Sequence, residues 1–213
     1  MYIPQHYQEK RPEVLARAIR DIQFALLVTA VDGAYHASHI PMVLKHADGA
    51  LTLEGHVARP NRHWTVLASK PASLAVFQGP QAYVSPSWYE TKRQHGKVVP
   101  TWNYVVVHAH GPLEIVEEQD WLLAHLGDLV AANESSREQP WAISDAPADF
   151  IHGLTRSIVG LRLPVRRLEG KCKMIQNRSQ ADRLGTLAGL SVSADPEDQA
   201  VGAIMRALEG ERR

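Results

Sequence analysis

The sequence predicts one domain that is mainly β, a β-barrel-like fold with helices added to it. Short apolar or β-branched runs follow one another closely between residues 24 and 57, and Asp-Gly pairs at 32–33 and 48–49 separate them as hairpin turns would. The pattern lacks the regular alternation of strands and long helices that marks a parallel sheet. Closely spaced antiparallel strands therefore favour a meander or barrel.

The first half of the chain begins with a helix and continues mainly as strands. Pro12 stands near a helix start, and apolar residues recur at helical spacing after it. Asn61 is a suitable cap for a short helix. The expected elements are a helix over 11–20, strands over 24–31, 35–45 and 50–57, a helix over 62–69, and strands over 72–78 and 81–85 that are broken at Gly79-Pro80.

The second half contains the strongest strand signal of the chain, the β-branched run over 103–114. The other expected elements are a loop over 86–100, helices over 117–132 and 147–154, a strand over 157–167, and a helical tail whose last helix runs from Pro196 to about Leu208. We expect residues 1–178 to form the barrel-like domain and residues 179–213 to be a helical extension of the same domain.

The charge of the chain is balanced in total and uneven along its length. Lys and Arg together number 23, and Asp and Glu together also number 23. This balance excludes a strongly basic protein whose main task is to bind DNA. Residues 59–97 carry a local charge of +5 and residues 156–183 carry +6, whereas residues 114–150 carry −8. The two basic segments either converge on one anionic ligand or pair with the acidic segment on the surface.

The single cysteine, Cys172, excludes an intramolecular disulfide and a cysteine-based zinc site. We expect a cytoplasmic protein, because the sequence starts without a signal-peptide pattern and no apolar run approaches the length of a membrane helix. We expect no membrane partner.

Metal binding and nucleophilic catalysis receive little support from the sequence. His108 and His110 share one face of a strand, but no acidic residue or cysteine stands nearby in sequence to complete a ligand set, so we expect no metal. No Gly-x-Ser-x-Gly, Walker or Gly-x-Gly-x-x-Gly motif occurs, and no catalytic residue is identified.

Three clusters combine polar, basic and aromatic residues. The run 55–64, with Arg59, Asn61 and His63, joins a strand end to a helix start and is a plausible phosphate cradle. The runs 82–89 and 99–104 offer flat aromatic surface with hydroxyl groups, which suits a planar heterocycle. Alternatively, these aromatic residues fill the core or a dimer interface.

The sequence resembles the PaiB-type family of FMN-binding negative transcriptional regulators. The resemblance spans nearly the whole chain and is carried by six motifs in order: Met1-Tyr2-Ile3-Pro4, His39-Ile40-Pro41, Gly55-His56-Val57-Ala58-Arg59, Ala82-Tyr83-Val84-Ser85-Pro86-Ser87-Trp88-Tyr89, Val99-Pro100-Thr101-Trp102-Asn103-Tyr104 and Gln176-Asn177-Arg178. It implies an FMN-binding split β-barrel of the flavin-reductase and pyridoxamine-phosphate-oxidase type with a helical C-terminal tail. It also implies a homodimer with ligand sites at the subunit interface.

The resemblance implies an FMN site built from several motifs. His39, Ile40 and Pro41 would border the flavin ring; Arg59, Asn61 and His63 would approach the phosphate or ribityl chain; Thr101, Trp102 and Asn103 would line the pocket; Lys173, Gln176 and Arg178 would close it. The chain departs from the family where Pro60 replaces Ala, and where Ile175 replaces a Ser whose hydroxyl is a possible ligand.

Three functions remain open at this stage. The first is an FMN-binding homodimer with a transcriptional-regulatory or redox-sensing role; the neutral charge and the lack of a helix-turn-helix pattern argue against direct DNA binding. The second is a flavin-dependent oxidoreductase, or a haem-handling relative, on the same fold. The third is an interaction module whose pocket has lost its ligand.

Overall fold

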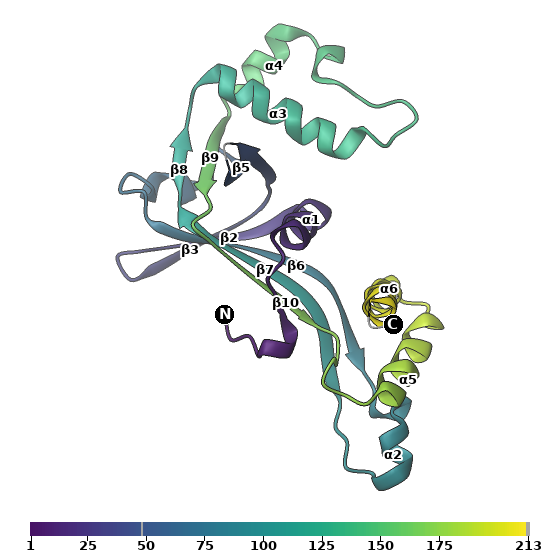
Figure 1. Cartoon of the computed structure of the whole chain (residues 1–213). Helices are drawn as coiled ribbons and strands as arrows, with labels where there is room; N and C mark the ends of the chain where they lie inside the picture. Colours follow the sequence, from purple (N-terminus) through teal and green to yellow (C-terminus); the bar gives the residue numbers. More distant parts are fainter. Residues whose placement is uncertain (48, 212–213) are drawn as a thin grey trace. The chain divides into compact units, whose positions relative to one another are not determined.

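The computed structural model describes residues 1–47 and 49–211, which fold as two compact units (Figure 1). We call Leu15–Phe77 with His108–Leu168 the barrel unit, and Met1–Val14 with Gln78–Val107 and Glu169–Arg213 the tail unit. The boundary expected at residue 178 stays a prediction. Among the described residues, no helix has the length and apolarity required to cross a membrane.

The strands form two antiparallel sheets, which confirms the predicted mainly β class. They are β1 (Gln8–Glu9), β2 (Phe24–Val31), β3 (Ala34–Pro41), β4 (Val43–Ala47), β5 (Ala50–Ala58), β6 (Ala72–Val84), β7 (Thr101–Pro112), β8 (Glu114–Val116), β9 (Ile158–Pro164) and β10 (Arg167–Lys173). One sheet has the order β1-β10-β7-β6-β2-β3 and the other has the order β4-β5-β9-β8. Strands β6, β7 and β10 contribute residues to both units.

The helices lie between the strands and after them. The α-helices are α1 (Pro12–Ile22), α2 (Glu90–His95), α3 (Gln119–Glu134), α4 (Ala148–Thr155), α5 (Gln180–Ser191) and α6 (Pro196–Gly210). The 3-10 helices are η1 (Gln5–Tyr7), η2 (Arg62–Val66), η3 (Pro86–Trp88) and η4 (Ile143–Asp145).

The core of the barrel unit lies on the inner face of β2, β5, β6 and β9. Inward-facing residues alternate with outward-facing ones along β2, so that Ala25, Leu27 and Thr29 are fully buried. Thr29 and Ser73 share a buried hydrogen bond of 2.7 Å across the β2–β6 pair. The two hydroxyl groups therefore satisfy each other inside the core.

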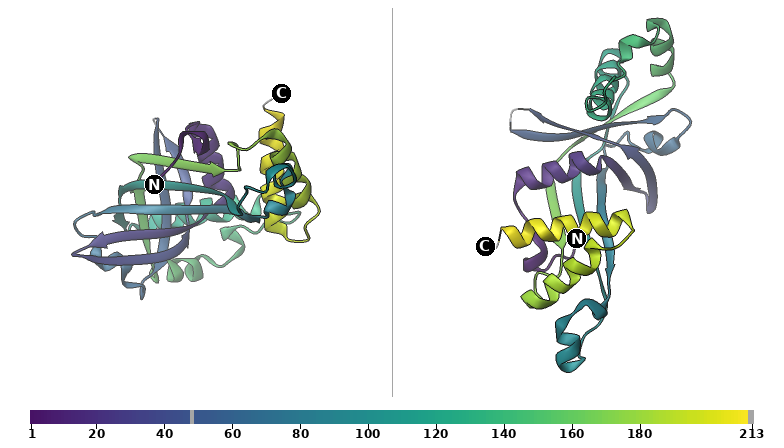
Figure 2. Two further views of the ribbon diagram at one scale, coloured as in Figure 1. Left: turned by 90° about the horizontal axis from the view of Figure 1, so that it is seen from below. Right: turned by 90° about the vertical axis from the view of Figure 1, so that its right-hand side faces the viewer.

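The tail unit has its own core, formed by α5, α6 and the ends of β6 and β7. Its fully buried side chains include Val84, Tyr89, Leu190 and Val201, and α5 packs side by side with α6 (Figure 2). Buried Asp182 on α5 accepts hydrogen bonds from the backbone N–H and the hydroxyl of Thr91 at the start of α2, at 2.9 and 2.8 Å. The predicted tail helices therefore belong to a packed unit.

Two predicted strands are each divided where the chain passes from one sheet to the other. The run 35–45 becomes β3 and β4 on either side of buried Met42, whose N–H donates to the Gln23 carbonyl at 2.9 Å. The run 103–114 becomes β7 and β8 on either side of buried Leu113, whose N–H donates to the Pro71 carbonyl at 3.1 Å. A continuous β-branched run does not indicate such a change of sheet.

Other expectations were wrong locally. Strand β6 continues through Gly79-Pro80, because a strand tolerates proline where its missing N–H is not needed for the ladder. The expected loop over 86–100 contains two short helices. Ser85 caps the start of η3, and Gly96, in the left-handed conformation, ends α2. The helix over 62–69 is the short η2, and the strand expected to end at 167 is followed by β10. Asp48 of the expected 48–49 turn lies outside the described residues.

Candidate functional site

The residues that the resemblance assigned to FMN fall into two groups, one in each unit. The barrel unit holds His39, Ile40, Pro41, Arg59, Asn61 and His63. The tail unit holds Thr101, Trp102, Asn103, Lys173, Gln176 and Arg178. Within each unit, segments that are distant in sequence lie together.

In the barrel unit, η2 packs on β3 through a buried hydrogen-bond network. The Ser38 hydroxyl lies 3.0 Å from Nδ1 of His63 and accepts a hydrogen bond of 3.0 Å from Nδ2 of Asn61. The Asn61 side-chain oxygen in turn accepts from the backbone N–H of His63 at 3.0 Å, as the predicted cap requires. Asn61 thus fixes the start of η2 and orients Ser38 at the same time.

His63 is held in this network as a largely buried ring. Its exposed fraction is 4%, and burial, followed by the nearby His36, lowers its pKa. Its Nε2 atom is buried without a hydrogen-bond partner among the described residues. A buried polar atom in this state is costly, which marks the Ser38–His63 corner as a place where a partner would be stabilised.

Arg59 is committed to contacts within the barrel unit. Its guanidinium donates to the carbonyls of Arg156 and Ile158 at 3.0 and 3.2 Å and to the carboxylate of Glu117 at 2.9 Å. It also lies 5.7 Å from the ring centroid of Trp64. A phosphate contact by Arg59 would have to replace at least one of these hydrogen bonds.

At the end of β3, only some of the expected side chains face outward. His39 is exposed and stacks on Phe24 with ring centroids 6.3 Å apart, and Pro41 is half-buried. Ile40 points inward and is 6% exposed. Its Cδ1 atom would lie 3.1 Å from a Cβ added at Gly55. The outward groups at this edge are therefore an imidazole and a pyrrolidine ring, with the Ile40 backbone between them.

In the tail unit, Lys173 organises the second group. Its ammonium donates to the hydroxyl of Thr101 and to the carbonyl of Trp102, and it lies 5.9 Å from the ring centroid of Tyr104. Burial, followed by the charge of Lys171, lowers its pKa. The indole of Trp102 is 52% exposed and packs edge to face against Tyr83 at 6.0 Å. This arrangement combines a cation with flat, accessible aromatic surface.

Two expected ligands in the tail unit face inward or fold back on their own turn. Asn103 is fully buried, and its Nδ2 lies 3.4 Å from the Met205 sulfur. Gln176 accepts from the Met174 N–H at 2.8 Å and donates to the Cys172 carbonyl at 2.6 Å, so both ends of its amide are used. These two side chains shape the strand and the turn that present Trp102 and Lys173.

The departure at Ile175 also has a structural explanation. Its side chain is 2% exposed and belongs to the tail-unit core. Its backbone has φ of 51°, a left-handed conformation that is uncommon for a β-branched residue. Core burial therefore holds a strained turn at the position where the family has a hydroxyl.

Arg178 lies beside two tyrosines of the tail unit. Its guanidinium carbon is 4.7 Å from the ring centroid of Tyr89. The Tyr7 hydroxyl donates to the Asn177 side-chain oxygen at 2.7 Å, and burial raises the pKa of Tyr7 while the charge of Arg178 opposes the rise. Tyr7 was not among the expected site residues, because nothing in its local sequence places it beside residues 177–178.

Lys171 and Tyr104 were also missed by sequence reasoning. Lys171 lies 5.2 Å from the Tyr104 ring centroid and 5.7 Å from that of Tyr2, and it donates to the Tyr2 carbonyl at 3.2 Å. The period of a strand contains the signal, because Lys171 and Lys173 share one face of β10 and Trp102 and Tyr104 share one face of β7. Lys171, Lys173, Trp102 and Tyr104 form what we call the lysine–aromatic face.

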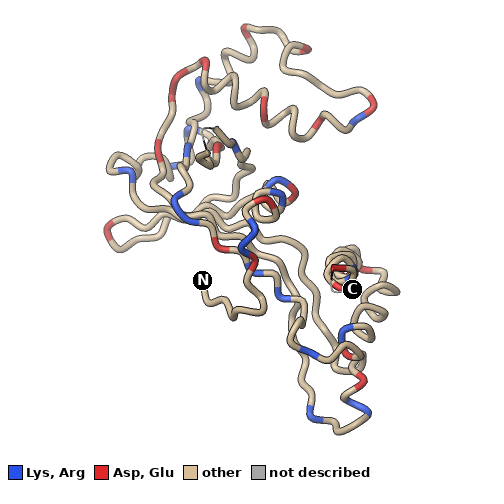
Figure 3. The backbone as a smooth tube through the Cα atoms, in the orientation of Figure 1, with Lys and Arg blue, Asp and Glu red and all other residues tan. Residues whose placement is uncertain are grey.

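The charged segments partly neutralise one another within the barrel unit. Glu114 accepts from Lys70 at 3.1 Å and from Arg162 at 2.9 Å, and these hydrogen bonds, that of Arg162 first, lower its pKa. Figure 3 marks the acidic positions along β8, α3 and α4. The alternative of pairing between acidic and basic segments therefore holds for part of the chain.

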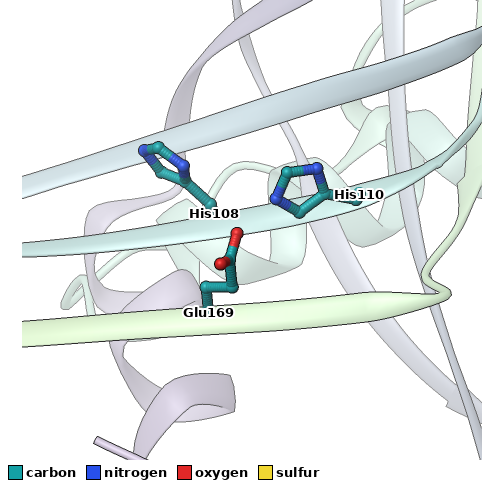
Figure 4. Close-up of side chains that lie close together, drawn as sticks. All are labelled: His108, His110 and Glu169. Atoms are coloured by element: carbon teal, nitrogen blue, oxygen red, sulfur yellow. The ribbon is translucent and has the colours of Figure 1, made fainter. Parts of the chain in front are cut away.

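One cluster has the composition of a metal site. Figure 4 shows His108 and His110 on β7 with Glu169 on the neighbouring β10, and their candidate ligand atoms lie within 4.8 Å of one another. Glu169 also accepts from the N-terminal ammonium at 3.1 Å, and Nη2 of Arg167 lies 3.2 Å from both ring nitrogens of His110. Because cations already adjoin both ends of the cluster, we assign no metal to it.

Solved structures of other proteins share this fold. The flavocytochrome Anf3 from Azotobacter vinelandii matches with a TM-score of 0.59 at 11% identity, covering 86% of this chain and 78% of that chain. The FAD and heme binding protein from Mycobacterium smegmatis matches with a TM-score of 0.53 at 12% identity, covering 84% and 78%. The fold is that of a split barrel found in flavin-binding proteins, as the sequence predicted.

Sequence comparisons then identify the family. The family model described as "Putative FMN-binding domain" matches residues 1–167, and the chain belongs to this family. An uncharacterized protein from Emericella nidulans is 32% identical over 97% of this chain and 96% of its own length. Protease synthase and sporulation protein PAI 2 from Bacillus subtilis is 28% identical over 96% of each chain. The resemblance to the PaiB type is thereby confirmed.

Proposed function

We propose that this protein is a homodimeric, PaiB-type FMN-binding regulator that senses flavin or its redox state. The observation that carries the proposal is the family match over residues 1–167, together with similarity to protein PAI 2 along nearly the whole chain. The name of that relative connects it with protease synthesis and sporulation, which supports a regulatory role here. We expect the protein to act in the cytoplasm.

The residues present in each unit fit the chemistry of FMN. The lysine–aromatic face offers a cation for an anionic group and flat rings for stacking. The Ser38–His63 corner offers a buried nitrogen that lacks a hydrogen-bond partner within residues 1–47 and 49–211. We propose that flavin binding uses Lys173, Thr101 and Trp102 in the tail unit and His39 and His63 in the barrel unit. FMN, when bound, supplies the electron-transfer chemistry.

Not every expected residue is proposed to touch FMN through its side chain. Asn103, Ile40, Gln176 and Asn61 are proposed to position the strands and turns around the site, because their side chains are buried or bonded within their own turn. Arg59, Pro41 and Arg178 are proposed as flanking groups at the margins of the site. This division assigns direct binding to the accessible groups and to His63, whose buried Nε2 has no hydrogen-bond partner among the described residues.

The first test is the absorbance and stoichiometry of purified protein mixed with FMN and then freed of unbound flavin. We expect retained flavin absorbance, and weaker retention of riboflavin because it lacks the phosphate. Lys173→Met should weaken FMN binding about tenfold, because it removes a charge-assisted donor. Lys97→Met, at an exposed lysine of the same unit, is the matched control and should bind normally. A protein that retains no flavin would refute the proposal.

The homodimer is supported by an apolar outer face on the barrel unit. Register pairs Leu26 with Val76 and with His39 on this face, and pairs Phe24 with Pro41. Phe24 is 57% exposed, and the other members are half-buried or exposed. An exposed apolar surface of this kind marks an interaction site, and a second copy of this chain supplies a matching surface.

Light scattering during gel filtration tests this surface. We expect a dimer for the wild type, and a monomer for Val76→Lys because the substitution places a charge on the apolar face. Val192→Lys is the matched control, since Val192 is 86% exposed on the tail unit and should leave the dimer intact. A monomeric wild type, or a dimeric Val76→Lys protein, would contradict the proposed interface.

The alternative to the regulatory role is that of a flavin-dependent oxidoreductase. Flavin-loaded protein that consumes NAD(P)H in the presence of an electron acceptor would show it, whereas unchanged nicotinamide absorbance across several acceptors supports the regulator.

A further inference from the structure

The barrel unit contains an open groove at the end of β3 opposite to His39. The groove has a volume of about 770 Å³, within the usual range for small-molecule sites. Tyr35 lines it, and four residues along a strand separate Tyr35 from His39 by about 13 Å. None of the residues expected to bind FMN lines this groove.

The floor of the groove is apolar. Outward-facing Val28 and Ala30 on β2 and Leu74 on β6 form it, and the register pairs Val28 directly with Leu74. Ala30 is paired with Tyr35, whose ring is 81% exposed at the rim. The floor therefore offers small apolar side chains beneath an accessible aromatic ring, a surface that suits a flat apolar molecule.

The rim of the groove is basic. It carries three basic side chains, those of Lys70, Arg166 and Arg167, and one carboxylate, that of Glu114. Lys70 and Arg162 already donate to Glu114, so its charge is matched. Arg166 is exposed, and its guanidinium makes no hydrogen bond or ion pair with the described part of the chain. An anion in the groove would therefore find an available Arg fork.

The position of the arginine turn is fixed by backbone contacts. The Arg166 N–H donates to the His110 carbonyl at 2.8 Å, which ties the turn to β7. The neighbouring Gly111 leaves no space for a side chain, since an added Cβ would lie 2.1 Å from the Pro164 carbonyl oxygen. On the opposite rim, Lys70 adopts φ of 48°, a strained conformation for a residue other than glycine. The two basic rims are therefore held in place by the fold.

We propose that this groove binds a small organic anion. One carboxylate or phosphate group contacts Arg166, and a flat apolar body lies on the floor formed by Val28, Ala30 and Leu74. The pair Val28–Leu74 adjoins the apolar face assigned to the dimer, so the ligand lies at the margin of that interface. Binding there is independent of the flavin site.

Calorimetric titration of the protein with 2-naphthoate tests the proposal. We expect saturable binding of 2-naphthoate. The uncharged counterpart, naphthalen-2-ylmethanol, should bind with an affinity lower by about fivefold or more. Phenyl phosphate, compared with inorganic phosphate, tests the phosphate version of the same chemistry. If the two phosphates bind equally, or if the alcohol binds as well as the naphthoate, the proposed combination of apolar floor and basic rim is wrong.

Variants locate the binding. Arg166→Ala should weaken 2-naphthoate binding about fivefold or more, and Ala30→Trp should block it by filling the floor. Arg20→Ala is the matched control, because Arg20 is an exposed arginine of the same unit outside the groove. Unchanged binding in Arg166→Ala and Ala30→Trp would overturn the proposal.

Titrations of flavin-loaded and flavin-free protein separate this inference from the proposed function. We expect 2-naphthoate to bind both forms and to leave the retained flavin in place. Displacement of FMN by 2-naphthoate would mean that the probe occupies the flavin site, which would overturn the separate groove. A protein that retains no FMN but binds 2-naphthoate through Arg166 would refute the flavin proposal and support the groove.

Discussion

A histidine pair with one fully buried ring should make the stability of the barrel unit sensitive to mild acid. His125 on α3 is 1% exposed, and its Nε2 lies 3.0 Å from Nδ1 of His56 on β5. Its ring stacks on Trp121 at 5.3 Å, and its own Nδ1 is buried and has no hydrogen-bond partner in the described part of the chain. Lys45 and Asp128 form an ion pair beside it. Burial in this environment disfavours the protonated, charged form of His125.

The size of the effect follows from the pKa shift. Burial, and then the nearby His56, lower the pKa of His125 from 6.5 to about 4, and burial also lowers the pKa of His56. Because the unfolded chain binds the proton at higher pH than the folded chain does, stability is full above the unfolded pKa and falls with pH between 6.5 and about 4. From about pH 7 to about pH 5, His125 alone should cost about 2 kcal/mol of unfolding free energy.

Urea unfolding at several pH values between about 7 and 5 measures this loss. His125→Gln retains an amide that can donate to His56 and removes the titrating ring, so its unfolding free energy should fall about 2 kcal/mol less than that of the wild type over the same range. His46→Gln, at an exposed histidine of the same unit, is the matched control and should behave as the wild type does. Equal losses in His125→Gln and the wild type would refute the reasoning.

Three substitutions and one modification rate test the packing within each unit. Gly160→Ala should lower the unfolding free energy by about 1–3 kcal/mol, because an added Cβ would lie 2.4 Å from Cζ3 of Trp121. Gly127→Ala should raise the unfolding free energy by about 0.5–1 kcal/mol, because no atom lies within 4 Å of an added Cβ there. Urea unfolding measures both effects. Asp182→Asn should cost about 1–3 kcal/mol by the same measurement, since a buried carboxylate that accepts two hydrogen bonds from α2 becomes a mismatched amide. Cys172 should react with iodoacetamide far more slowly in the native protein than in urea, because burial raises its pKa to about 11, and equal rates would contradict that burial.

The class of fold and the type of most elements could be predicted from local patterns, because the periodicity of a strand or helix is visible in consecutive residues. The change of sheet at Met42 could not, since it depends on a hydrogen bond to Gln23 from an earlier part of the chain. The same limit applies to β10, whose first partner is the short β1 at the other end of the sequence. Contacts between distant segments decide both, and no local pattern encodes them.

The motif residues illustrate the same limit within the site. Asn61 and Gln176 carry polar groups that sequence alone would assign to a ligand, yet both use those groups to fix their own turns. Lys173 and Trp102 have the same sequence signal, yet the strand directions leave the indole exposed and place the ammonium over aromatic rings. A motif therefore marks where a site is built but does not separate the residues that hold a ligand from those that hold the backbone. Substitutions make that separation: loss of a turn-forming residue should lower stability together with FMN affinity, whereas loss of the Lys173 ammonium should lower FMN affinity while the unfolding midpoint of the flavin-free protein stays near that of the wild type.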